Sequence, residues 1–221
     1  MQVNFTYNKD KDIWCLLNKG KSSNNSQNPT KQYEQLVAEF GNNPTEKDIT
    51  TFVDKYISKN SIGISSRLAD FQKDWESVSV EFQKRAETIF GITLPNDVIA
   101  YLTINSRCPY SIQDNFFYAS VQSAQARRTV MHELWHFYTW YGLGAGQEEK
   151  LGKQKYNDLK EALTVLLNVE CKDLLTEGMI DTGYPQHQEI REKIIAYWEK
   201  DRNIKNLWNY LVDQVSREDS N

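Results

Sequence analysis

Cysteine is scarce in this chain of 221 residues, and the chain has no excess of positive charge. Lys and Arg number 26 against 30 Asp and Glu, so the formal net charge is −4. This balance leaves no excess positive field to bind a nucleic-acid backbone or an anionic lipid surface, and we expect neither a nucleic-acid nor a membrane partner. The three cysteines are too few and too widely spaced to form a disulfide framework or a CxxC metal pair.

Long apolar runs are also missing from the sequence. No stretch reaches the length of a membrane-spanning helix, and residues 1–10 lack the apolar core of a secretory signal. If Met1 is the native start, we therefore expect a cytoplasmic protein whose thiols are reduced. Hydrophobic residues make up 39% of the chain and charged residues 25%, which is typical of a globular protein large enough to bury a core.

Apolar side chains recur at helical spacing along most of the chain. The spacing predicts helices over 30–40, 45–58, 65–90, 123–141, 158–175 and 188–215. Alternating, β-branched and aromatic residues predict strands of a small sheet over 3–7, 98–104 and 116–121. Because there is no repeat and no clear domain boundary, we predict one α+β domain over residues 1–221, with a mainly helical N-terminal layer over 1–95.

Two of the three histidines lie within five residues, in the sequence His132-Glu133-Leu134-Trp135-His136. This is an HExxH motif on a predicted helix. Residues four apart on a helix point the same way, so both imidazoles can bind one metal ion. Glu133 lies beside them, where a general base can take a proton from a metal-bound water. A chance match would have to place two of three histidines here by accident, so we expect Zn²⁺ as cofactor.

The third zinc ligand has to come from outside the motif, because catalytic sites usually combine three protein ligands with a water. The metzincin pattern is excluded, since Thr139 and Gly142 stand where it requires Gly and His. A Glu on the following helix is the other common solution, and both Glu161 and Glu170 meet it. Glu161 borders the apolar face of that helix, but the segment from Asp158 to Glu161 also fits a capping box that needs no metal.

With this pattern the chain resembles the gluzincin group of zinc metallopeptidases over residues 116–168. The pattern of that group is HExxH followed by a Glu ligand on the next helix. The resemblance implies that His132, His136 and Glu161 are the metal ligands and that Glu133 is the general base. In one respect the chain departs from the group. The Asn often found just before the ligand Glu is Lys160 here, which leaves unassigned the residue that supports a histidine from behind.

The same resemblance implies a compact zincin-like fold. Its parts are a small, mostly antiparallel sheet, the motif helix and a following ligand helix, so that residues 96–221 form the catalytic core. In that group the strand before the motif helix is a sheet edge that binds the substrate backbone. Phe116–Val121 occupies this place, so a peptide or protein substrate is expected along that edge strand. No pattern indicates the oligomeric state.

Peptide hydrolysis also needs a hydrogen-bond donor for the oxyanion, beyond what the metal provides. Tyr184 and His187 stand in a loop after the ligand helix and are the candidate catalytic donors. A turn with a surface histidine would have the same sequence. Tyr138 and Tyr141 are further candidates.

Together these features predict a zinc-dependent peptidase that cleaves peptide bonds with a metal-activated water. Three alternatives stay open: a catalytically silent zincin-fold binding or regulatory module, a zinc amidohydrolase with a non-peptide substrate, and a helical interaction protein without metal. Glu133 favours catalysis over a silent site, because a structural metal site needs no base.

Overall fold

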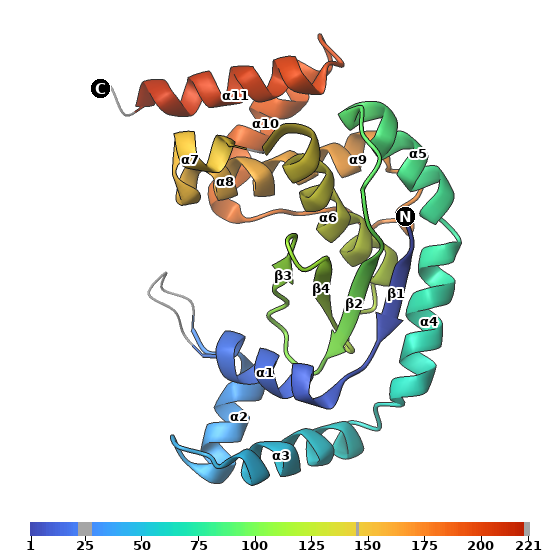
Figure 1. Cartoon of the computed structure of the whole chain (residues 1–221), viewed down its shortest axis with the longest axis vertical. Coiled ribbons are helices and arrows are strands. Elements are labelled where there is room, and N and C mark those ends of the chain that lie inside the picture. Colours follow the sequence, from blue (N-terminus) through green and yellow to red (C-terminus); the bar gives the residue numbers. More distant parts are fainter. Residues whose placement is uncertain (22–27, 145, 219–221) are drawn as a thin grey trace. The chain divides into compact units, whose positions relative to one another are not determined.

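The computed structural model describes residues 1–21, 28–144 and 146–218 (Figure 1). Within these ranges the predicted α+β class is confirmed, since the chain is mainly helical and contains a small mixed sheet. The chain divides into two compact units, the first formed by residues 1–75 and 96–126 and the second by residues 76–95 and 127–221. Each unit contains residues from both the expected N-terminal layer (1–95) and the expected catalytic core (96–221). The single domain and the zincin-like fold stay predictions.

The first unit is built on a sheet of four strands in the described part of the chain. In spatial order these are β1 (Val3–Thr6), β2 (Val98–Thr103), β4 (Phe116–Ser120) and β3 (Tyr110–Ser111). β1 and β4 both run parallel to β2, and only β3 and β4 are antiparallel. The expected mostly antiparallel sheet is therefore wrong. Parallel neighbours need a long connection, and several helices lead from β1 to β2, while residues 104–115 lead from β2 to β4.

The prediction that Phe116–Val121 is an edge strand is also wrong, because β4 is paired on both sides. It pairs with β2 along its whole length and with β3 through Phe116 and Phe117. In addition, the backbone N–H of Tyr118 donates to the carbonyl of Pro109 at 2.9 Å. The short strand β3 covers this side because the chain folds back on itself before β4 begins.

Among its described residues, the first unit also contains four helices: α1 (Lys9–Lys19), α2 (Lys31–Phe40), α3 (Glu46–Lys59) and α4 (Ile64–Glu76). The predicted helices over 30–40 and 45–58 are confirmed as α2 and α3. Thr30 and Thr45 cap them with their side-chain oxygens, and Asp48 completes a capping box on α3. In Figure 1 α4 runs alongside β1, and the rings of Phe5 and Phe71 are 5.8 Å apart.

The helix predicted over 65–90 is two helices, α4 and α5 (Ser79–Phe90). The interruption falls at Ser77 and Val78, where a serine and a β-branched residue lower helix propensity. The apolar spacing continues across this break, which is why the sequence pattern did not show it. α5 belongs to the second unit, whereas α4 belongs to the first.

The second unit contains α5 and the helices that follow the sheet. These are α6 (Ala126–Thr139), α7 (Gln147–Leu151), α8 (Lys153–Leu163), α9 (Leu167–Glu170), α10 (Gln188–Trp198) and α11 (Ile204–Glu218). A π-helical turn, Trp140–Gly144, follows α6, and 3₁₀ turns at Thr164–Leu166 and Pro185–His187 precede α9 and α10. The predicted helix over 188–215 is two helices, because the Asn203 side chain accepts from the N–H groups of Lys205 and Asn206 and caps α11.

Helix α6 packs its apolar face into the core of the second unit. Trp135 and Tyr138 are fully buried and meet Phe90 of α5, with ring centroids 5.1 and 5.7 Å from the Phe90 ring. Val130 and Met131 are buried as well. The helix that carries the HExxH motif is therefore fixed by aromatic packing.

In the first unit, Asp12 ties α1 to β2. The Asp12 side chain is buried, and its Oδ1 accepts from Thr103 Oγ1 at 2.6 Å and from the Ile104 N–H at 3.0 Å. Asp10, on the same helix, is exposed. Asp12 is therefore a structural residue of this unit, and it anchors the first helix of the chain on the sheet.

Replacing Asp12 by Ala should lower the free energy of unfolding by about 1–3 kcal/mol, because two buried donors would lose their acceptor. Urea unfolding followed by circular dichroism measures the change. Asp10→Ala is the matched control and should have a much smaller effect. Equal stability of the Asp12→Ala and Asp10→Ala variants would contradict this account of α1.

Candidate metal centre

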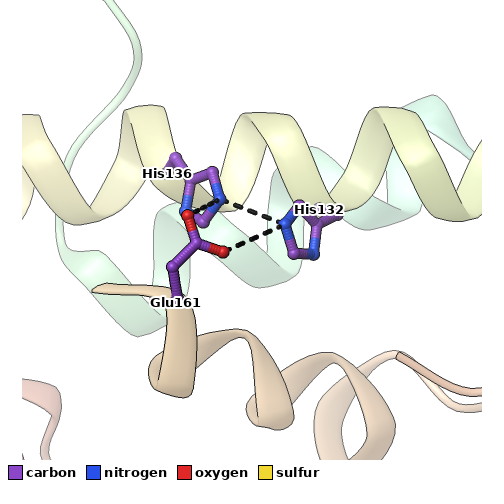
Figure 2. Close-up of side chains that lie close together, drawn as sticks. All are labelled: His132, His136 and Glu161. Carbon is purple, nitrogen blue, oxygen red and sulfur yellow. Dashed lines mark hydrogen bonds and ion pairs between the residues drawn. The ribbon is translucent and has the colours of Figure 1, made fainter. Parts of the chain in front are cut away.

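Three predicted metal ligands meet in the second unit (Figure 2). His132 and His136 lie one turn apart on α6, and Glu161 approaches them from α8. The two Nε2 atoms are 3.1 Å apart. Glu161 Oε1 lies 3.3 Å from His136 Nε2, and its Oε2 lies 3.6 Å from His132 Nε2.

The distances between these three side chains fit one tetrahedral ion. Zinc bonds of about 2.0–2.1 Å to nitrogen and oxygen separate the ligand atoms of a tetrahedron by about 3.3 Å. The spacing between the two Nε2 atoms is 3.1 Å and that between His136 Nε2 and Glu161 Oε1 is 3.3 Å, both close to that value, while the other carboxylate oxygen, Oε2, lies 3.6 Å from His132 Nε2. The side chain of His136 is 1% exposed, whereas those of His132 and Glu161 are 23% and 19% exposed. The cluster is therefore partly exposed to solvent at His132 and Glu161.

The protonation equilibria of the cluster also favour a cation. Burial alone would raise the pKa of Glu161, but the neighbouring imidazoles of His136 and His132 hold it well below its usual range. Burial lowers the pKa of His132, yet hydrogen bonds to Asp181 and Glu161 outweigh it and raise this pKa to about 10. The ionised carboxylates thus stabilise positive charge at the position that a metal ion would take.

Asp181 supports His132 from behind, and sequence reasoning missed it. Its Oδ2 lies 2.6 Å from His132 Nδ1. The pKa of Asp181 is about 2, since burial raises it but the His132 contact lowers it more, so the carboxylate is ionised and can only accept. Nδ1 therefore carries the hydrogen and Nε2 is directed to the metal side. Asp181 is therefore the residue that supports a ligand histidine from behind, which the sequence left unassigned because Lys160 stands where an Asn is often found. Asp181 lies in a loop 49 residues after His132, so no motif spacing indicates it.

Glu133 is the buried carboxylate next to the cluster. It is 8% exposed, and its Oε2 has no hydrogen-bond partner among the described residues. Burial raises its pKa above the ordinary value. A buried acceptor without a partner is costly, so a carboxylate kept in this state is suited to exchanging a proton with something that enters the site.

Glu170, the alternative third ligand, lies elsewhere. Its Oε1 accepts from Trp198 Nε1 at 2.8 Å and pairs with Arg202. It belongs to α9, which the 3₁₀ turn Thr164–Leu166 separates from the α8 helix that carries Glu161. Of the two candidates, the structure brings Glu161 to the histidines.

The capping-box interpretation of Asp158 is wrong, because α8 begins five residues earlier, at Lys153. Asp158 instead accepts from Gln154 one turn before it and pairs with His187. Glu161 is therefore an interior residue of α8 with no role at a helix start. Its carboxylate is left for the two histidines.

The predicted oxyanion donors lie beside Asp158. His187 is 5% exposed, and its Nε2 is 3.0 Å from Asp158 Oδ1. His187 and Asp158 line a pocket of about 420 Å³ together with residues of α8, α10 and α11. Tyr184 is half exposed and meets the His187 ring edge-on at 5.6 Å. His187 is thus a buried, paired histidine rather than a surface one, and a catalytic role for either residue stays a prediction. Of the further candidates, Tyr138 belongs to the core.

Comparison with known proteins gives no family assignment, because no protein family, curated protein or solved structure matches the chain. In the described ranges, no helix has both the length and the apolar character that crossing a membrane requires. The kind of site therefore has to be inferred from the residues that form it. Two imidazoles and one carboxylate that converge from two helices form a candidate metal centre.

Metal content per chain tests the ligand set. We expect near-stoichiometric zinc in the wild type and in Glu170→Ala, and loss of zinc in His136→Ala and Glu161→Ala, because each of these two removes one of three protein ligands. Elemental analysis of untagged protein measures it. Zinc retained in Glu161→Ala but lost in Glu170→Ala would contradict the ligand set.

Proposed function

We propose that the protein is a zinc-dependent peptidase. The observation that carries the proposal is the buried carboxylate of Glu133, whose Oε2 has no hydrogen-bond partner among the described residues, next to a cluster of two histidines and one glutamate. Two His and one Glu are a ligand set of catalytic zinc sites, which keep a fourth position for water. The cluster is open to solvent at His132 and Glu161, as a site that admits a substrate requires.

Each residue has a distinct role in the proposed reaction. His132, His136 and Glu161 hold the ion, and Asp181 fixes the ring orientation of His132. When bound, zinc supplies Lewis acidity that activates a water and polarises the scissile carbonyl. Glu133 takes the proton of the attacking water and later delivers it to the leaving amine. Burial raises the pKa of Glu133, which brings the carboxylate closer to the basicity that this proton transfer needs.

A silent metal site explains Glu133 less well. A structural zinc site gains nothing from a buried carboxylate oxygen that lacks a partner, and keeping one costs stability. A zinc amidohydrolase would use the same residues on a non-peptide amide. A peptide is the expected substrate because of the resemblance to gluzincins. The substrate is not placed along β4, since β4 is paired on both sides.

Glu133→Gln separates catalysis from metal binding. The variant should keep the zinc content of the wild type and lower kcat by about 10²–10⁴-fold, because it removes the base but no ligand. Turnover of a fluorogenic peptide library and elemental analysis measure the two effects. Glu192→Gln, at an exposed position of α10, is the matched control and should behave as the wild type.

Two outcomes would reject the proposal. Wild-type turnover in Glu133→Gln would exclude the proposed base. Zinc-loaded wild type that cleaves no peptide but hydrolyses small non-peptide amides would identify the amidohydrolase instead.

A further inference from the structure

Asp181 has a second charged partner on the side away from the metal. Arg191 of α10 is 4% exposed, and its Nη1 lies 3.1 Å from Asp181 Oδ1. Its Nη2 donates to the backbone carbonyl of the same residue. The two carboxylate oxygens of Asp181 are therefore divided, Oδ2 to His132 and Oδ1 to Arg191. A carboxylate held at both oxygens cannot rotate away from the imidazole.

Thr164 connects this pair to the third metal ligand. Its hydroxyl lies 2.7 Å from the backbone carbonyl of Glu161 and 2.9 Å from Asp181 Oδ1. Arg191 Nη1 donates to the same hydroxyl oxygen at 3.0 Å. The guanidinium thus contacts one group that orients His132 and another that holds the backbone of Glu161.

The loop that carries Asp181 is shaped to enclose the guanidinium. Asn168 fixes the backbone of Asp181 through two hydrogen bonds, of 2.7 and 2.8 Å. Gly183 has φ +61°, and a Cβ atom there would lie 2.5 Å from Arg191 Nη1. Only a residue without a side chain lets the loop approach Arg191 this closely.

We propose that Arg191 is a positioning residue of the metal centre. Acting through Asp181 and Thr164, it holds His132 and Glu161 in the orientation that binds the ion. The proposal rests on the metal-binding part of the proposed function and does not depend on the substrate. A buried ion pair adds little net stability compared with apolar packing, so control of geometry explains this one better than stability does. The expected consequence is on metal affinity, since partners behind a ligating histidine typically contribute about 10–100-fold.

Arg191→Met tests the proposal against Arg85→Met. Arg85 is the matched control because it forms a two-pronged ion pair with Asp173 in the same unit, and its hydrogen-bond partners among the described residues, Glu81, Glu170 and Asp173, are not proposed metal ligands. Zinc affinity is measured by competition with a chromophoric chelator, and ligand geometry by the visible absorption bands of the Co²⁺-loaded protein. Arg191→Met should bind zinc about 10–100-fold more weakly and change the Co²⁺ bands, whereas Arg85→Met should change neither. Wild-type affinity and Co²⁺ bands in Arg191→Met would overturn the proposal.

A glycine pair keeps the proposal testable where Arg191→Met does not fold. Gly183 and Gly178 both have positive φ, so Ala strains the backbone at either position. Only at Gly183 does the new methyl group meet the guanidinium, while at Gly178 nothing lies within 4 Å. Gly183→Ala should weaken zinc binding and shift the Co²⁺ bands, and Gly178→Ala should not. Equal affinity and equal bands in the two variants would overturn the proposal.

These measurements use the metal alone and separate the two proposals. If Arg191→Met weakens zinc binding while the wild type cleaves no peptide, the positioning role stands and the peptidase does not. A wild type that binds no zinc would overturn both. If peptide cleavage is found but neither Arg191→Met nor Gly183→Ala changes the affinity, only the positioning role is rejected.

Discussion

Helix α6 packs in the core with one face and carries two of the candidate metal ligands on the other. The arrangement of the second unit depends on this division. One face packs Trp135 and Tyr138 against Phe90 and is fully buried. The other face presents His132 and His136 to Glu161. Because helix geometry fixes the angle between these faces, the aromatic packing also sets the direction of the imidazoles. The positions of the two imidazoles in the candidate site are therefore determined by the packing of α6 in the core.

Charge balance around this helix explains why the site needs residues far from the motif. Three carboxylates, Glu133, Glu161 and Asp181, lie close to one another and are largely buried. Buried anions are stable only next to cations or donors. Arg191 supplies one fixed positive charge to this group, and His132 supplies a second when it is protonated. A metal ion held by the same ligands would take over the role of the His132 proton, which links metal binding to the stability of the cluster.

The sequence predicted the parts of the site that helix periodicity determines. Residues four apart share a face, so the pairing of His132 with His136 follows from local geometry alone. Glu161 could be proposed but not separated from Glu170, because the start of α8 and the 3₁₀ turn after it decide which way each carboxylate points. Asp181 and Arg191 could not be predicted. They join the site through a loop whose path depends on tertiary packing, and a loop has no period that reveals its contacts.

The predicted α+β class is confirmed, but the predictions of sheet order and strand direction failed for a related reason, and this failure does not affect the metal centre. Strand positions followed from composition, but strand neighbours and directions depend on long connections, so the sheet order and the covered side of β4 were missed. The sheet belongs to the first unit, whereas His132, His136, Glu161, Asp181 and Arg191 all belong to the second. The ligand set and its support are thus contained in one unit of the chain. The case for metal chemistry stands on that unit's own contacts, whichever fold family the sheet resembles.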